Sequence, residues 1–462
     1  MKKIGLIGLL FGLLLVLSGC LSQGGEEFYA LPQLPQDYLA LQKTINEVVS
    51  ELDAEYAAPA SGSNSQSIQL QDLDADGRRE TAVAFFRAPS AERPLKIYFF
   101  RQDPISEQYE TAWVIEGEGT GIYSVTFDNL GDTKAKEVIV SWQISSTVRS
   151  LAVYSLQYNS NAVELMRSGY TKYALMDMDR DEENEILLVH LDTVENNSSA
   201  ELYDYESGVM IMESQVNLSM NLTSIQAAKV GTLSDSSPAL FVTSGFGDNL
   251  GRVTDVITMQ YGTLCNLTMN ENSGMSTSTV RYYSDFGDVN GKDINYDGIL
   301  ELPLPEELPP LNDTSARMHM LHWYQYSPEG AAIHICTTFH CYEDSWYMIL
   351  PDEWRGQVSA VRQESFGNTA AAERAITFYH YQVEEDEDGE EKVNARQFLT
   401  VYRLTGTNRA ARAAMDGRFV LFETSDVIYA ARFWESDWDC GLTEEDVIER
   451  FDRIVSAWNA EN

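Results

Sequence analysis

Three short loops in this chain carry oxygen-bearing side chains at every second position, followed by a glutamate four residues later. Their residues are Asp72, Asp74, Asp76 and Glu80; Asp177, Asp179, Asp181 and Glu185; and Asp293, Asn295, Asp297 and Glu301. Oxygens at positions 1, 3 and 5, a backbone carbonyl at 7 and a carboxylate at 9 can surround one hard cation, and a glycine at position 6 permits the sharp turn. The pattern predicts bound calcium with a structural role.

The same residues have a simpler interpretation, because aspartate and asparagine also cap tight turns through their own hydrogen bonds. In the loop that begins at Asp177, position 6 is Glu182 instead of glycine. A left-handed backbone at this residue would cost about 1 kcal/mol. The loops are not EF-hands, since Val83, Leu188 and Leu304 occupy the twelfth position. Turn capping therefore stays open as the alternative to metal binding.

The acidic loops belong to a longer repeat. They begin at residues 72, 177 and 293, and weaker copies lie about midway, at 127–132 and 229–231, each leading into an apolar run. Neither weaker copy is expected to bind metal. The second has Lys134 and Lys136 in its loop, and the fourth keeps a single acid, Asp235. Strands are expected near 67–71, 80–87, 95–101 and 109–116. Four short strands per repeat are typical of a propeller blade, so the expected fold is mainly β, a β-propeller with five visible repeats.

The loops and the apolar strands after them resemble FG-GAP and VCBS-type repeats over residues 66 to 340. The resemblance implies a calcium-binding β-propeller of an extracellular protein, which we place at residues 67–344. It also implies that the aspartates, the asparagine and the final glutamates named above are the metal ligands.

The N-terminus has the features of an export signal. Lys2 and Lys3 precede an apolar run too short to span a membrane. Leu17–Cys20 resembles the lipobox of bacterial lipoproteins, which implies a signal peptide at residues 1–19 and a lipid on Cys20. The expected location is the outer face of a bacterial membrane, attached through that lipid; an uncleaved anchor is the alternative. A lipidated tether and an amphipathic helix, capped by Asp37, are expected within residues 20–66.

Charge and cysteine content narrow the class of protein. The chain has 71 acidic and 32 basic residues and a formal net charge of -39, which argues against nucleic acid as a partner. Besides Cys20 there are four cysteines, of which Cys336 and Cys341 could pair outside the cell or stay as free thiols. No Gly-x-Ser-x-Gly, His-Glu-x-x-His or P-loop sequence is present.

A small α+β domain is expected at residues 345–462. Its predicted strands cover 358–363, 375–382, 398–404 and 419–433, and a last helix capped by Thr443 should carry Val447, Ile448, Phe451, Ile454, Val455 and Trp458 on its apolar face. Its opening Trp346–Trp354 segment and the strand at 426–429 resemble a PsbP-like domain of bacterial lipoproteins.

These features favour a cell-surface lipoprotein that acts as a binding or scaffold module for a protein or cell-wall ligand. An exported hydrolase with its site on the propeller loops and a sensor subunit for a membrane partner are the alternatives. A fold alone does not choose between them.

Overall fold

The computed structural model describes residues 36–455, apart from 104, 107, 132, 157–160, 248–250, 312–315, 365–372, 386–390 and 416. The expected signal peptide and Cys20 therefore lie outside the described residues. The described chain is mainly β, with α-helices α2 (Gln36–Leu52), α3 (Arg409–Ala413) and α4 (Glu444–Arg450). None of the helices in these ranges has the length and apolar character needed to cross a membrane.

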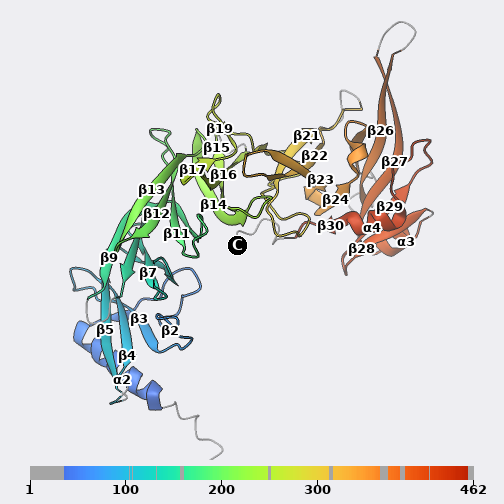
Figure 1. Ribbon diagram of the computed structural model, residues 1–462. Helices are drawn as coiled ribbons and strands as arrows, with labels where there is room; N and C mark the ends of the chain where they lie inside the picture. The colour runs from blue at the N-terminus through green and yellow to red at the C-terminus, as the bar shows by residue number, and fades with distance from the viewer. Residues whose placement is uncertain are drawn as a thin grey trace, which may run out of the picture. The chain divides into compact units, whose positions relative to one another are not determined.

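The chain divides into two compact units, and the first contains residues 1–125 and 156–162. Its sheet is formed by β1 (Glu55–Tyr56), β2 (Ile68–Gln71), β3 (Thr81–Arg87), β4 (Leu95–Gln102) and β5 (Tyr109–Gly117), in agreement with the four predicted strands. Helix α2 lies alongside this sheet (Figure 1), because its apolar stripe places Leu41 and Ile45 against Ala82, Ala84 and Phe86 of β3. The expected amphipathic helix is present, and its apolar stripe is buried against this sheet.

Further antiparallel sheets follow in chain order. Their strands are β6 (Gly121–Asp128), β7 (Glu137–Gln143), β8 (Arg149–Ser155) and β9 (Val163–Tyr170); β10 (Lys172–Met176), β11 (Glu185–His190), β12 (Ser199–Glu206) and β13 (Val209–Asn217); β14 (Leu222–Thr232), β15 (Pro238–Phe246), β16 (Gly251–Gln260), β17 (Thr263–Asn266) and β20 (Thr279–Arg281); and β21 (Leu302–Glu307), β22 (His319–Tyr326), β23 (Ala332–Cys341), β24 (Trp346–Leu350) and β30 (Phe451–Arg453). A short hairpin pairs β18 (Met269–Asn270) with β19 (Met275–Ser276).

Each repeat loop enters the equivalent strand of its sheet. The loops join β2 to β3, β6 to β7, β10 to β11 and β14 to β15, and the fifth loop precedes β21. In the fifth copy an isolated bridge between Lys292 and Glu301 takes the place of a full first strand. The repeat seen in the sequence is thus a repeat of loop-to-strand connections. It places the first and third acidic loops at the start of the buried strands β3 and β11, and the fifth at the start of β21, which is buried only at its first residues.

Strands β3, β7, β11 and β15 are continuous apolar runs because both of their faces are covered. In the second unit, Ile139 of β7 packs in one core with Ile186 and Leu188 of β11. On its other face β11 packs through Leu187 against Leu240 of β15. Within the second unit, the sheets that contain β7, β11 and β15 therefore share their cores.

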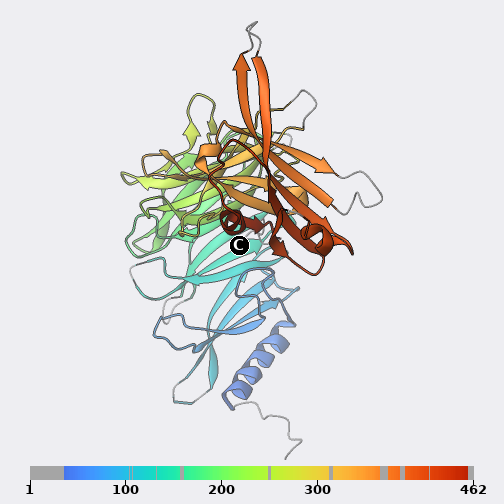
Figure 2. The same cartoon turned by 90° about the vertical axis from the view of Figure 1, so that its right-hand side faces the viewer.

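The C-terminal sheet has the order β25-β26-β27-β29-β28 and carries α3 and α4. Its strands are β25 (Val358–Glu364), β26 (Glu373–Glu385), β27 (Glu391–Thr405), β28 (Arg418–Glu423) and β29 (Val427–Phe433). Figure 2 shows the long β26–β27 hairpin extending beyond the rest of this sheet. The expected strands are present, and the segment predicted as one strand at 419–433 is a hairpin of two.

The division expected at residue 345 falls within another hairpin. Strand β24 pairs with β23 through contacts such as Phe339 opposite Met348. One continuous core also joins Met320 and Phe339 to Phe378 and Val401 of the C-terminal sheet. Strand pairing and core packing therefore run across the expected boundary.

The last helix is shorter than predicted. Thr443 caps α4 as expected, in a capping box with Asp446. The helix ends at Arg450, and Phe451–Arg453 continues as β30, paired with the open edge of β24. Phe451 is therefore a strand residue, since pairing with an available sheet edge takes precedence over the helical spacing of the sequence. Trp458 lies outside the described residues.

The thiols of the second unit are free. Cys265, Cys336, Cys341 and Cys440 form no disulfide in the described chain. Burial raises the pKa of the Cys336 thiol to about 12. Of the two alternatives for Cys336 and Cys341, the structure shows the free buried thiols.

His340 on β23 should make the protein sensitive to acid. It is fully buried, and burial lowers its pKa to about 3. Below pH 6.5 the unfolded chain binds a proton that the folded chain does not, so the free energy of unfolding should fall by about 1.4 kcal/mol per pH unit until the folded group titrates. Because the raised pKa of Glu185 contributes a slope of opposite sign, the His340 contribution is measured by urea denaturation at several pH values as the difference in slope between the natural protein and His340→Leu. The matched control is His334→Leu, which changes a partly exposed histidine on the same strand and should keep the slope; an unchanged slope in His340→Leu would contradict the assignment.

Candidate metal centres

The structure gathers the acids of all three predicted loops. In each loop, ligand oxygens from the acidic side chains lie within 4.8 Å of one another. The groups are Asp72, Asp74 and Asp76; Asp177, Asp179, Asp181 and Glu185; and Asp293, Asp297 and Glu301. Ten of the twelve predicted ligands therefore belong to one of these groups, and Asn295 lies in the loop between two members of the third group. The exception is Glu80.

The three loops share one backbone geometry. The N–H at position 6 donates to the first aspartate in each, from Gly77 to Asp72 at 3.0 Å, from Glu182 to Asp177 at 3.1 Å and from Gly298 to Asp293 at 2.9 Å. Position 4 is left-handed as well, with φ of 55° at Ala75, 72° at Arg180 and 62° at Tyr296. Turn capping is therefore real, and it holds the carboxylates together instead of excluding a shared ligand.

Glu182 confirms the backbone conformation expected at position 6. Its φ is 76°, against 91° at Gly77 and 88° at Gly298. Glu182→Gly should raise the free energy of unfolding in chelator by about 1 kcal/mol, because the left-handed backbone loses its Cβ conflict and one negative charge leaves the loop. Glu183→Gly is the matched control, since Glu183 is not left-handed. Denaturant titration should show the gain for residue 182 alone; an equal gain at 183 would mean that charge, not backbone strain, is responsible.

The final glutamate closes the loop in the same way in three copies. One carboxylate oxygen accepts the N–H of the residue seven positions earlier, from Met178 to Glu185 at 2.5 Å and from Ile294 to Glu301 at 2.8 Å. The weaker second copy has the same bond from Leu130 to Glu137 at 3.2 Å. The position-9 carboxylate is thus part of the loop's own structure.

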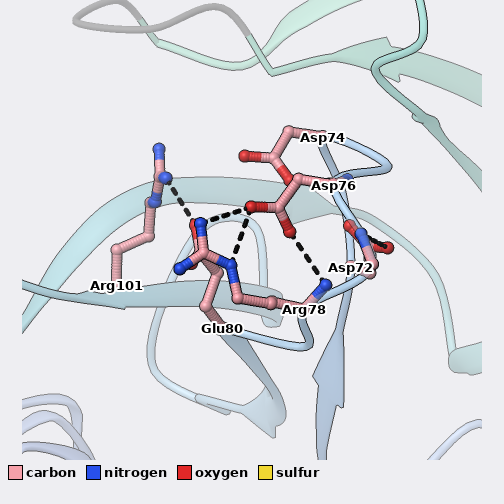
Figure 3. Close-up of polar contacts among 7 residues, drawn as sticks. Asp72, Asp74, Asp76, Arg78, Glu80 and Arg101 are labelled. Atoms are coloured by element: carbon pink, nitrogen blue, oxygen red, sulfur yellow. Dashed lines mark hydrogen bonds and ion pairs between the residues drawn. The ribbon is translucent and has the colours of Figure 1, made fainter.

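The first loop departs from this arrangement. Glu80 binds the guanidinium of Arg101 on β4 at 3.0 Å, and Figure 3 shows it turned toward Arg101 and apart from Asp72 and Asp74. Asp76 is bound by Arg78, and this hydrogen bond lowers the pKa of the Asp76 carboxyl. The structure therefore does not bring Glu80 together with Asp72, Asp74 and Asp76, because arginines bind two acids of this loop. No spacing in the sequence pointed to Arg101.

Two buried carboxylate oxygens show whether the loops are suited to hold a cation. Oε1 of Glu185 and Oδ1 of Asp72 are buried, with no hydrogen-bond partner in the described part of the chain. Glu185 as a whole is 2% exposed. Burial, with smaller contributions from Asp179, Asp181 and Asp204, raises its pKa to about 8. A buried carboxylate oxygen without a donor, among other acids, is what an oxygen-ligated cation would satisfy.

In the fifth loop, amide side chains donate hydrogen bonds to the carboxylates. Gln325 of β22 donates its amide N–H groups to Asp297 at 2.7 Å and to Glu301 at 2.6 Å. Asn295 donates to Asp297 at 2.8 Å. Burial still raises the pKa of Glu301. Sequence reasoning missed Gln325, which lies 24 residues from its partner Glu301.

In the described residues, neither of the two degenerate loops contains a cluster of three or more acidic side chains. In the second, the Asn129 amide, oriented so that its nitrogen donates, reaches the backbone oxygens of Gly131 at 3.1 Å, Ala135 at 3.2 Å and Thr133. In the fourth, Asp235 accepts the N–H of Ser237 at 2.8 Å and its hydroxyl at 2.7 Å. An amide or a hydroxyl thus fills the turn in the copies that are not expected to bind metal.

Comparisons with known proteins add little. No family model matches the chain, and no curated protein matches it. Among solved structures, a protein from Lactobacillus plantarum is 10% identical with a TM-score of 0.27, over 77% of this chain and 99% of that one. The periplasmic gluconolactonase of Pseudomonas aeruginosa is 8% identical with a TM-score of 0.27, over 73% and 89%. Sqt1 of Saccharomyces cerevisiae is 11% identical with a TM-score of 0.30, over 65% and 78%. Similarity this distant supports no conclusion about function.

Proposed function

We propose that this chain is a calcium-stabilised β-propeller lipoprotein that acts as a binding or scaffold module on the outer face of a bacterial membrane. Its sheets would be the blades, of the FG-GAP and VCBS type, and the C-terminal sheet with the exposed β26–β27 hairpin would be free to meet a protein or cell-wall ligand. An exported hydrolase and a sensor subunit remain the alternatives for the same scaffold.

One observation carries the metal assignment. Glu185 is buried in a group with Asp177, Asp179 and Asp181, and its Oε1 has no donor in the described chain. Calcium, when bound, would supply positive charge that neutralises these oxygens. The residues that would hold it are the four acids of the third loop, Asp293, Asn295, Asp297 and Glu301 of the fifth, and Asp72, Asp74 and Asp76 of the first. The role is structural, because each loop is fixed to the start of a core strand.

Calorimetric titration of chelator-treated protein with calcium tests the proposal. Heat of binding should appear in the natural protein and decrease in Asp179→Ala and in Asp297→Ala. Asp235→Ala, in a degenerate loop, should bind as the natural protein does. Absence of any calcium binding by well-folded protein would refute the metal assignment.

The membrane attachment rests on the lipobox resemblance of Leu17–Cys20, and it has its own test. In a bacterial host, Cys20→Ala should abolish incorporation of labelled fatty acid and leave an unprocessed or unlipidated product. Cys265→Ala is the control and should be labelled as the natural protein is. Labelling that survives Cys20→Ala would reject lipid attachment at Cys20.

A further inference from the structure

In the third and fifth loops, the final glutamate faces a different kind of side chain on the next strand of its sheet. In the fifth sheet, the pairing of Leu302 with Tyr324 puts Gln325 opposite Glu301. In the third sheet, the pairing of Ile186 with Tyr203 puts Asp204 opposite Glu185. One position in the sheet therefore holds an amide in one repeat and an acid in the other.

This difference accounts for the state of the carboxylate oxygens. In both loops one oxygen of the glutamate accepts the backbone N–H seven residues earlier. The other oxygen of Glu301 accepts the Gln325 amide at 2.6 Å, whereas the other oxygen of Glu185 is buried without a donor in the described chain. An ionised aspartate cannot donate a hydrogen bond, so Asp204 offers Glu185 no replacement for that amide.

The first loop shows a third arrangement. The pairing of Thr81 with Arg101 puts Gln102 opposite Glu80, and Arg101, one residue earlier on β4, binds Glu80 at 3.0 Å. The strand after the loop thus supplies a cation in the first sheet, a neutral donor in the fifth and an acid in the third. Calcium affinity in such sites increases with the number of negatively charged ligands and decreases when a built-in donor competes for them.

We infer that the residue facing the loop's last carboxylate from the next strand sets the order in which the loops bind calcium, and that Asp204 makes the third loop the tightest site. The inference rests on the proposed calcium binding. The inferred order of calcium affinity is the reverse of the one suggested by position 6, where glycine in the first and fifth loops avoids the backbone strain of Glu182 in the third. Gln325 holds the fifth loop closed through its amide N–H groups.

Exchanging the two side chains tests this order. Asp204→Gln gives the third loop the donor of the fifth and should weaken the tightest calcium site by about tenfold or more. Gln325→Asp gives the fifth loop the acid of the third and should tighten its site by a similar factor. Terbium or calcium titration of the full-length chain, before and after Asp179→Ala, assigns the tightest site, which Asp179→Ala should remove.

The matched control is Ser155→Asp. The pairing of Val138 with Tyr154 puts Ser155 opposite Glu137, in the repeat whose loop has lost its acids, so this substitution should leave calcium binding unchanged. In chelator, Asp204→Gln should melt at or above the temperature of the natural protein, because Glu185 gains a donor; this shows that the variant is folded.

The outcomes separate the two proposals. If the natural protein binds no calcium, the proposed function fails. If it binds calcium but the tightest site survives Asp179→Ala, or Asp204→Gln leaves that site's affinity unchanged, the inferred order is overturned while calcium binding stands.

Discussion

Calcium at a hundredfold excess over its Kd should raise the free energy of unfolding by about 2.7 kcal/mol for each occupied loop, relative to protein in chelator. The gain arises because the converged carboxylates exist only in the folded chain, so the ion binds the native state and not the unfolded one. Thermal or urea denaturation with calcium and with chelator measures the difference. Part of it should be lost in Asp74→Ala, in Asp179→Ala and in Asp297→Ala.

Asp235→Ala provides the baseline for this comparison. Asp235 holds a turn through Ser237, so its loss can lower stability, but it should do so equally with calcium and with chelator. A calcium-dependent gain that persists at full size in all three loop variants, or that Asp235→Ala removes, would show that the ion acts elsewhere on the protein.

Residues 345–462, produced alone, should give no cooperative unfolding transition. Strand β24 would lose its partner β23, and the core would lose Leu308, Met320 and Phe339, which pack with Phe378 and Val401 across the expected boundary. Loss of several large buried side chains, each contributing 2 to 5 kcal/mol by order of magnitude, exceeds the stability of a typical domain.

A chain of residues 126–462 is the matched control for this fragment. It contains the whole second unit, with residues 156–162 of the first, and includes every partner of β24 and the complete core. It should unfold in a cooperative transition by circular dichroism. A sharp transition for residues 345–462 would mean that the C-terminal sheet is an independent domain after all.

Much of the local structure could be predicted from the sequence because it depends on neighbouring residues. The four strands of the first sheet follow from alternating and continuous apolar runs, and Thr443 caps its helix within one turn. The acidic loops also form from local bonds, each aspartate accepting N–H groups two to five residues further on. Such features need no knowledge of what lies across the sheet.

The contacts that the sequence does not predict are those made by a distant strand. Glu80 has the spacing of a ligand, yet Arg101 binds it from the next strand. Phe451 has helical spacing, yet the edge of β24 takes it into a sheet. Gln325 and Asp204 matter only through the residues that the register places opposite them. A periodicity argument cannot reach these contacts, because each depends on which residues of two separate strands become neighbours.

Crystals equilibrated with terbium, a scattering substitute for calcium, give the most direct test of the central claim. Anomalous difference density should lie among Asp177, Asp179, Asp181 and Glu185, with further peaks at the first and fifth loops and none at Asn129 or Asp235. Crystals of well-folded protein that show no peak at any of the acidic loops would contradict the account, and the aspartates would then be turn caps alone.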